Sequence, residues 1–383
     1  MFQSLRAVAI LLLASIGLGG CGGSSTGAPT VTPPPPPPPP TRSVYMGFTP
    51  WPYDATQMAV DDTNQRIQDN GDIVAQHIMV GVPWNEALNR APYHPNVEAE
   101  LAGRLQMLQP GKAVFLAIDS LNQDRDGLAP NWGAAFNEPL PAPWDTLRFD
   151  QLAVSAAYTN FAIDLIFRFQ PLYFNYGTEI SELMLNDPTA FDEYVEFARI
   201  THTVLKGIFP NLPLMVSIAM KSPGSAEMAT IAAGFDRIRD YVDIVGVSTY
   251  PYVFFDHADK GDPDNLPADW LSQITDIAQG KPIAITENGW AAEDLVIPAF
   301  NVNVPSTASF QATYTARMLD EADQLDMEFV IWWTLTDFDA FWDGDLNQDP
   351  VARIWRDIGL VDENLIDRPA LSTWQAWYAR QRQ

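Results

Sequence analysis

The stretch KPIAITENGW, residues 281–290, joins a short apolar run to a carboxylate. The apolar residues lead directly to Glu287, and Asn, Gly and Trp follow at once. This pattern is typical of a buried parallel strand that delivers a polar side chain to the edge of a sheet. A catalytic carboxylate usually works with a second one. The position of that second carboxylate therefore decides whether Glu287 belongs to a catalytic pair.

Seven further apolar runs, mostly followed by polar or aromatic residues, occupy residues 44–51, 72–81, 113–119, 172–179, 214–220, 243–250 and 329–333. Segments with helical periodicity lie between these runs, for example at residues 95–109, 154–169, 189–209, 228–242 and 310–325. Eight strands rich in Val, Ile and Phe that alternate with helices predict an α/β fold, a single (β/α)8 (TIM) barrel. An open doubly wound sheet is the alternative, but no Gly-rich phosphate loop follows the first run.

In such a barrel the functional side chains gather at the C-terminal ends of the strands and in the loops after them. Two glutamates at these positions, Glu179 and Glu287, are the candidate catalytic residues. The candidate substrate-binding residues are Trp51, His77, Trp84, Asp119, Asn122, Tyr250, Trp290, Trp333 and Asp337. Aromatic rings among them suit the apolar C–H faces of sugars, although large aromatic residues also fill protein cores.

The choice of partner for Glu287 lies between Glu179 and Glu138. No apolar strand leads into the FNEP segment (136–139), and the prolines around it indicate a loop. Glu179 ends the fourth expected strand and Glu287 the seventh, so the two can face each other across the barrel mouth. Cleavage of a glycosidic bond requires such a pair, one as acid and one as nucleophile or base. The alternative is that each is a buried, paired carboxylate with a structural role.

Three motifs resemble those of clan A, the (β/α)8-barrel retaining glycoside hydrolases. ITENG (285–289) is similar to the nucleophile segment of family 1 β-glycosidases, and GVSTYPY (246–252) to a segment of family 53 galactanases and family 113 mannanases. WTLTDFD (333–339) resembles the eighth-strand segment of the clan. The resemblance implies that Glu287 is the nucleophile, Glu179 the acid/base, Tyr250 the residue that orients Glu287, and Trp333 a platform for a sugar ring.

The sequence departs from the clan at Thr178, where an Asn usually precedes the acid/base. Hydrolysis with retention of a β-linked polysaccharide or oligosaccharide, with endo action, is the expected activity. A catalytically silent barrel that captures glycan at the cell surface is the alternative. Metal or enolate chemistry with the same carboxylates is a third possibility. The lack of a His/Asp cluster at the strand ends counts against it.

The N-terminal region predicts export and anchoring. Residues 1–20 have the pattern of a signal peptide, and Leu18-Gly19-Gly20-Cys21 resembles a bacterial lipoprotein cleavage box in which Cys21 is lipidated. An ordinary secretory signal is the alternative. Residues 21–41, Gly/Ser-rich and then polyproline, predict a linker, which leaves residues 42–383 as one catalytic domain. We expect a lipoprotein at the outer membrane or cell surface that touches the membrane only through its lipid anchor.

The net charge of −26 argues against nucleic acid as a partner and fits a neutral polysaccharide or oligosaccharide. We expect a monomer with no cofactor and no metal at the active site. Two acidic segments, NQDRDG (122–127) and DGDLNQD (343–349), match calcium loops only in part. Solvated acidic turns are the favoured interpretation, and a structural calcium ion is the alternative.

Overall fold

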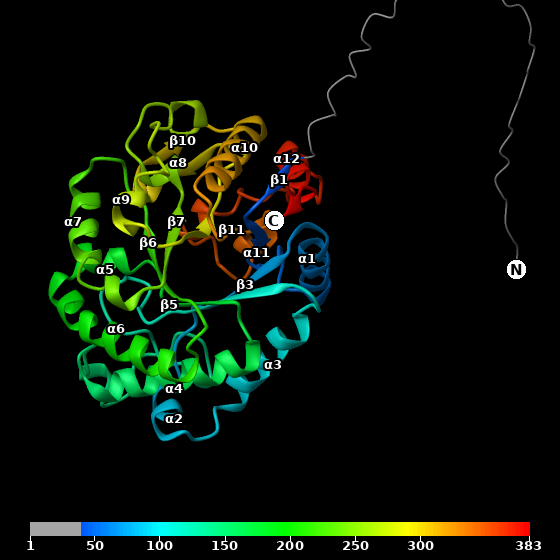
Figure 1. The fold of residues 1–383 in the computed structure, drawn as a ribbon. Helices are drawn as coiled ribbons and strands as arrows, with labels where there is room; N and C mark the ends of the chain where they lie inside the picture. Colours follow the sequence, from blue (N-terminus) through cyan, green and yellow to red (C-terminus); the bar gives the residue numbers. More distant parts are fainter. Residues whose placement is uncertain (1–39) are drawn as a thin grey trace, which may run out of the picture. The chain divides into compact units, whose positions relative to one another are not determined.

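The computed structural model describes residues 40–383, and its centre is a closed barrel of eight parallel strands (Figure 1). Around the barrel the strands are β11 (Phe329–Trp332), β2 (Tyr45–Phe48), β3 (Ile73–Ile78), β4 (Ala113–Ile118), β5 (Tyr173–Gly177), β6 (Leu214–Ala219), β7 (Ile244–Thr249) and β8 (Ile283–Asn288). Each of the eight apolar runs supplies one strand, so the predicted (β/α)8 barrel is confirmed. The predicted signal peptide, Cys21 and the linker up to residue 39 lie outside the described residues.

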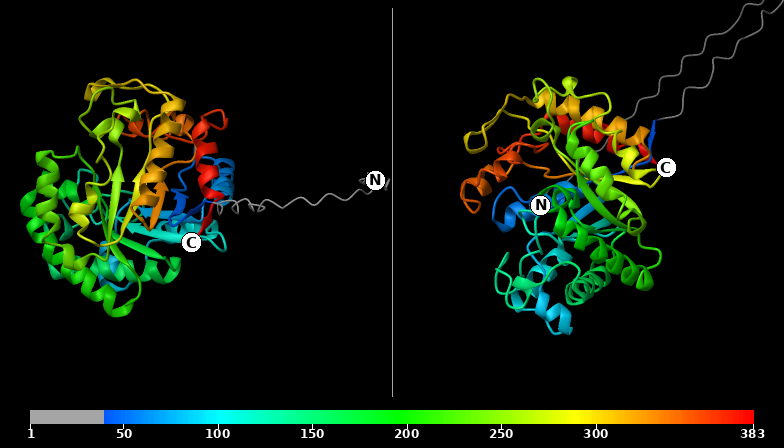
Figure 2. Two further views of the ribbon diagram at one scale, coloured as in Figure 1. Left: turned by 45° about the horizontal axis from the view of Figure 1, so that its top comes forward. Right: turned by 90° about the vertical axis from the view of Figure 1, so that its left-hand side faces the viewer.

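Helices surround the strands and cover their outer faces (Figures 1 and 2). They are α1 (Gln57–Asn70), α2 (Trp84–Asn89), α3 (Pro95–Met107), α4 (Leu152–Phe169), α5 (Ile180–Asn186), α6 (Pro188–Ile208), α7 (Ala226–Phe235), α8 (Pro251–Phe254), α9 (Ile274–Ala278), α10 (Ala308–Gln324), α11 (Asp339–Asp343) and α12 (Pro369–Tyr378). Helix α4 is long and apolar enough to cross a membrane, but it packs inside the protein with over half of its residues buried.

Four of the helices begin where a side chain satisfies one or two of their first backbone N–H groups. Thr56 caps α1, Asp187 caps α6, Ser225 caps α7 and Thr307 caps α10. Each of these oxygens accepts a hydrogen bond from an amide that has no partner within the helix. Short polar residues between the apolar runs therefore fix where the helices start.

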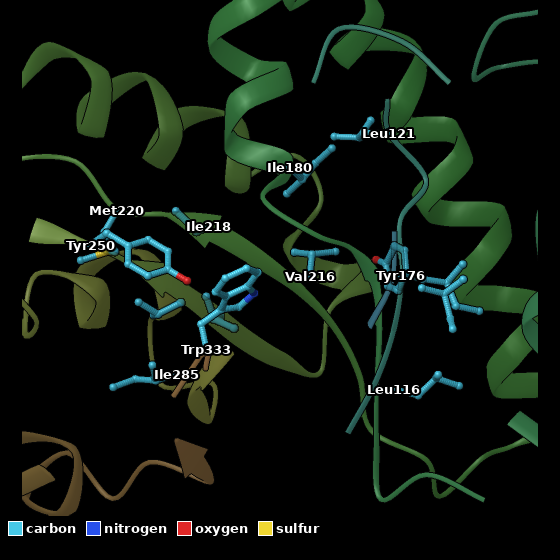
Figure 3. Close-up of a cluster of buried hydrophobic side chains, with 14 of the residues drawn as sticks. Leu116, Leu121, Tyr176, Ile180, Val216, Ile218, Met220, Tyr250, Ile285 and Trp333 are labelled. Atoms are coloured by element: carbon cyan, nitrogen blue, oxygen red, sulfur yellow. The ribbon is translucent and has the colours of Figure 1, made fainter. Parts of the chain in front are cut away.

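Two apolar layers hold the barrel together. Inside it, Phe329 packs against Phe115 and Tyr173, with ring centroids 4.9 and 4.8 Å apart. These rings belong to a small buried cluster that fills the part of the barrel below the mouth. A much larger cluster lies between the strands and the helices, and Figure 3 shows part of it, including Tyr250 and Trp333. Because both faces of the strands are buried, nearly every strand residue is apolar.

Smaller elements complete the chain. Strand β1 (Thr41–Arg42) pairs in parallel with β12 (Gln381–Arg382), and β9 (Leu295–Ile297) forms a hairpin with β10 (Val302–Val304). Five short 3₁₀ helices are η1 (Trp144–Thr146), η2 (Arg239–Tyr241), η3 (Pro263–Asn265), η4 (Pro298–Phe300) and η5 (Ala352–Ile354).

The strand register is irregular near the barrel mouth. Between β7 and β8 it shifts after Val247, so that Ser248 comes to lie opposite Glu287. A second shift, between β5 and β6, follows Asn175. Such bulges turn side chains out of the regular alternation and are frequent beside active sites. The irregular register therefore determines which polar groups meet at the mouth.

Candidate active site

Glu179 and Glu287 reach the barrel mouth from β5 and β8. Glu287 is the last residue but one of β8 and is partly buried. Glu179 lies two residues after the end of β5 and adopts a left-handed backbone conformation, with φ 50° and ψ 41°. Its amide donates a hydrogen bond of 2.9 Å to Ser217 Oγ. A left-handed conformation is uncommon for a residue other than Gly, Asn or Asp, and the hydrogen bond helps to hold it at this turn into α5.

One hydroxyl joins the two glutamates. Ser248 Oγ lies 2.7 Å from Glu179 Oε1 and 3.2 Å from Glu287 Oε2. The two carboxylate oxygens can therefore be no further apart than the sum of these distances, 5.9 Å. Both carboxyl groups thus face the same point at the mouth of the barrel.

A chain of charged groups continues from Glu179. Arg125 Nη2 lies 3.2 Å from Glu179 Oε2, and Arg125 Nη1 lies 3.0 Å from Asp119 Oδ2. The other oxygen of Asp119 is 2.6 Å from His77 Nε2. Thr178 Oγ1 lies 3.5 Å from the same imidazole nitrogen. The sequence-predicted residues His77, Asp119, Glu179 and Glu287 are thus brought together, with Arg125 as an additional member.

Burial and neighbouring charges shift several pKa values in this cluster. Burial, and then the charge of Glu179, raise the pKa of Glu287 to about 7. Although burial opposes the charged imidazole, the adjacent Asp119 raises the pKa of His77. Burial likewise opposes ionisation of Asp119, yet the positive charges of His77 and Arg125 hold its pKa far below the ordinary value. The site therefore combines an ionised Asp119, held between His77 and Arg125, with a glutamate, Glu287, that titrates near neutral pH.

A small pocket opens beside Glu287 and descends toward the interior of the barrel. It is lined by His77, Phe115, Ala117, Asn175, Thr178, Ser217, Ser248, Thr286 and Glu287. Its polar atoms converge on the two carboxylates, while Phe115 and Ala117 close its floor. Pockets with a few converging polar groups and a shifted pKa are the usual form of an enzyme site.

Aromatic side chains cluster at the C-terminal ends of β2 and β11, and β11 is the neighbour of β8 in the barrel. The Trp51 ring centroid lies 5.2 Å from that of Trp333 and 5.5 Å from that of Phe341. Trp333 also packs on Trp355, with centroids 5.6 Å apart. The indole N–H groups of Trp51 and Trp355 have no hydrogen-bond partner within residues 40–383. Trp51 is partly exposed, so this aromatic cluster offers a ring surface at the mouth of the barrel, whereas the two indole nitrogens are buried.

Three residues expected to contact substrate are instead packing residues. Trp84 and Trp290 are fully buried: Trp84 stacks on Trp144 and donates to Ala129 O, and Trp290 stacks on Tyr314. The pKa of Asp337, also fully buried, is raised well above its usual value by burial. The expectation of substrate contact is corrected at these positions, because no surface is left for a ligand.

The contacts of Tyr250 and Asn122 in the structure differ from those expected from the sequence. Tyr250 is buried and its hydroxyl has no hydrogen-bond partner in the described chain, so Ser248 and not Tyr250 contacts Glu287. Asn122 lies in the loop after β4, where its side-chain oxygen accepts from the amides of Asp126 and Gly127. This turn shapes the segment that carries Arg125 toward the site. Asn122 therefore has a structural contact in place of the expected contact with substrate.

Glu138 behaves as a loop residue. Its carboxylate accepts hydrogen bonds from Asn131 Nδ2 and from the amide of Ala135, both at 2.9 Å. These contacts close a turn and keep the side chain away from the two strand-end glutamates.

Carboxylates that could hold a cation gather around Asp337, and none of them belongs to the two acidic segments 122–127 and 343–349. In the described residues they form two trios, one with Glu293 and Glu363 and one with Asp339 and Asp357. Arginines already contact them: Arg368 lies 2.7 Å from Asp337, and Arg353 and Arg356 pair with Asp357. These ion pairs supply the positive charge that such a cluster needs.

No family model matches this sequence, and no curated protein sequence matches it either. Solved structures share its fold. An exo-β-1,4-mannosidase from Opitutaceae bacterium strain TAV5 is 12% identical with a TM-score of 0.60, over 89% of this chain and 60% of that one. The GH53 catalytic domain of Ignisphaera aggregans is 15% identical with a TM-score of 0.54, over 83% and 88% of the two chains. β-Glucuronidase 2 of Bacteroides uniformis is 13% identical with a TM-score of 0.51, over 88% and 34%.

The chain thus spans about 60% of the mannosidase and about a third of the glucuronidase. At these identities the likeness shows a common barrel architecture. What the chain does must be argued from its own site.

Proposed function

We propose that this protein is a glycoside hydrolase that cleaves β-linked glycans with retention of configuration. The observation that carries the proposal is the meeting of Glu179 and Glu287 at one hydroxyl. Retaining enzymes hold their two carboxyl groups about 5–5.5 Å apart, and inverting enzymes about 6.5–9.5 Å apart. The upper limit of 5.9 Å between the nearest oxygens favours the retaining class.

In the proposed reaction, ionised Glu287 attacks the anomeric carbon while protonated Glu179 gives its proton to the leaving oxygen. The bond between the anomeric carbon and that oxygen breaks, and a glycosyl ester forms on Glu287. Glu179 then removes a proton from water, whose oxygen attacks the same carbon and releases Glu287 as a carboxylate. Both carboxyl groups are thereby restored to their starting states.

The surroundings of the pair support a carbohydrate substrate. The rings of Trp51 and Trp333 pack together at the ends of neighbouring strands at the barrel mouth, where a sugar face can stack on the exposed part of Trp51. A mannosidase and a GH53 catalytic domain have the same fold, which makes β-mannan and β-galactan the first polymers to test. Endo action on a neutral polysaccharide, and export as a lipoprotein through Cys21, are further parts of the proposal.

The test is release of reducing sugar by residues 40–383 from galactan, mannan, xylan and mixed-linkage glucan. Glu179→Gln and Glu287→Ala should each lose the activity, and Glu138→Gln, a change at a loop glutamate outside the site, should keep it. Proton NMR of the first product should show the β-anomer. Cleavage that survives in the Glu287→Ala protein would rule out the proposed nucleophile.

A second candidate, a barrel that binds glycan without cleaving it, is favoured by one specific contact. Arg125 lies 3.2 Å from Glu179 and stabilises its charged form, whereas a proton donor must be neutral. Binding of a polymer with no product from any of the four substrates, under conditions from acidic to alkaline pH, would establish this function instead.

A further inference from the structure

Ser248 has one hydrogen but two carboxylate contacts. A hydroxyl can donate once and accept through its lone pairs. If Ser248 donates to Glu179 at 2.7 Å, the contact with Glu287 at 3.2 Å is a hydrogen bond only when Glu287 carries a proton and donates it to Ser248 Oγ. The shorter distance is typical of a hydroxyl that donates to an ionised carboxylate. The geometry therefore places the negative charge on Glu179 and the proton on Glu287.

The charged neighbours favour the same arrangement. Arg125 pairs with Glu179, and no arginine or lysine of residues 40–383 forms an ion pair with Glu287. The titratable groups that face the two glutamates are His77, Asp119, Arg125, Glu182 with its partner Lys221, and Tyr250. Of these, only Arg125 touches either carboxylate. The free protein is thus in the opposite protonation state to the one that the proposed reaction needs.

We propose that Ser248 is a positioning residue that passes the proton from Glu287 to Glu179 and so prepares the site for glycoside cleavage. This inference rests on the proposed function. In the transfer, the O–H bond of Glu287 breaks and its proton binds Ser248 Oγ. The original Ser248 O–H bond breaks at the same time, and that proton binds Glu179 Oε1. Ser248 remains a neutral hydroxyl, Glu287 becomes the carboxylate and Glu179 the acid.

No other side chain of the described residues offers the same bridge. The hydroxyl of Tyr250 makes no hydrogen bond, and Ser217 Oγ receives the amide of Glu179 instead of touching its carboxylate. Ser248 reaches both glutamates because the register shift between β7 and β8 sets it opposite Glu287. The bulge is therefore what makes the transfer possible.

The kinetic test compares leaving groups. The probes are 2,4-dinitrophenyl and phenyl β-glycosides of the sugar whose polymer is cleaved, because a dinitrophenolate departs without a proton and a phenolate requires one. At pH 6, Ser248→Ala should lose about 100-fold in kcat/KM on both glycosides, because Glu287 keeps its proton and cannot attack. At pH 8.5, where Glu287 is ionised, the loss on the dinitrophenyl glycoside should shrink to about threefold or less, since this leaving group needs no acid. Ser248→Thr, which keeps the hydroxyl, should restore both rates at pH 6. A loss on the dinitrophenyl glycoside that is the same at both pH values, or no loss at all, would overturn the proposal.

A second readout needs no substrate. Carbon NMR of glutamate labelled at its side-chain carboxyl should show one signal that titrates near pH 7 and disappears in Glu287→Gln. Ser248→Ala should shift this midpoint, because the protein loses the hydroxyl that contacts both carboxyl groups, and an unchanged midpoint would overturn the bridge. Ser155→Ala is the matched control, since Ser155 is a buried serine in α4 whose hydroxyl has no partner in residues 40–383.

The two readouts separate the two proposals. If no glycoside is cleaved but the Glu287 signal behaves as described, the proposed function fails and the placement of the proton stands. If the signal that titrates near neutral pH disappears in Glu179→Gln instead, the proton rests on the other glutamate and Ser248 has no transfer to perform.

Discussion

Arg125 reaches from the loop after β4 to Glu179, and its Nη2 atom lies 3.2 Å from Glu179 Oε2. The second arm of the guanidinium is held by Asp119 at 3.0 Å, and the backbone of Arg125 is left-handed, with φ 54°. The loop therefore adopts an uncommon backbone conformation at Arg125, and the side chain of this residue contacts one of the two central carboxylates. An arginine here favours the ionised state of Glu179, so its removal is the most direct way to learn what that charge does.

Arg125→Gln should move the acidic limb of the pH–activity profile to higher pH. The charge of Arg125 lowers the pKa of Glu287, so without this cation a higher pH is needed to ionise the nucleophile. The measurement is kcat/KM between pH 5 and 9 on the cleaved substrate. Arg125→Lys keeps the charge and should give a smaller displacement. A profile that keeps its shape while its height falls would show that Arg125 only supports the loop.

Glu287→Gln should stabilise the protein at pH 8 and have little effect at pH 5. The pKa of Glu287 is about 7 in the folded chain, above the ordinary glutamate value of 4.5, so the folded state binds more protons than the unfolded state between these pH values. Wild-type stability must therefore fall as pH rises through this window, and a permanently neutral glutamine avoids the loss. Calorimetry should show a Tm gain of a few degrees at pH 8. The same gain at both pH values would contradict the raised pKa.

Gly177→Ala should destabilise the protein and disturb Glu179, two residues further along. A Cβ at position 177 would lie 2.5 Å from Tyr194 Oη and 3.0 Å from Val216 Cγ1, and such overpacking costs about 1–3 kcal/mol. Gly103→Ala in α3 is the control, because a Cβ there meets nothing within 4 Å. That change should add about 0.5–1 kcal/mol through helix propensity. Urea unfolding of the two variants measures both effects, and equal midpoints would contradict the steric argument.

Trp51→Ala should weaken glycan binding, whereas Trp84→Phe should not. The Trp51 ring is partly exposed at the barrel mouth, where it packs on Trp333, so its loss removes a stacking surface. Trp84 is fully buried against Trp144, and its replacement should lower only the unfolding midpoint. Affinity electrophoresis in gels that contain the preferred polymer compares the two. Unchanged migration of Trp51→Ala would place the sugar elsewhere.

Much of the architecture was predictable from the sequence because buried parallel strands leave a continuous apolar signal. The runs at 113–119 and 282–287 became β4 and β8 almost unchanged. Glu179 and Glu287 could be found in the same way, since a strand end marks the barrel mouth. A tryptophan at a strand end does not by itself predict contact with substrate. Trp51 and Trp290 both follow apolar runs, yet Trp51 is partly exposed and Trp290 is buried.

Arg125 and Ser248 were missed because a loop conformation and a strand register shift determine their positions. Neither feature leaves a periodic pattern of apolar residues in the sequence. Ser248 lies inside an apolar run, and only the register shift after Val247 sets it opposite Glu287. Arg125 belongs to NQDRDG, a segment that was interpreted as a solvated acidic turn. One available signal was an arginine in a loop directly after a strand end, within a chain that has 48 acidic and 22 basic residues.

The pairing of β1 with β12 determines how the described domain would respond to a pulling force. Arg42 is fixed at the base of the barrel by an ion pair of 2.6 Å with Asp72, next to β3, and its carbonyl accepts the amide of Gln383 at 2.9 Å. Tension applied through the residues before Thr41 would first load this two-strand clasp between residues 41–42 and 381–382. Its hydrogen bonds lie at the base of the barrel, at the opposite ends of the strands from Glu179 and Glu287, so the first contacts to break would be remote from the mouth.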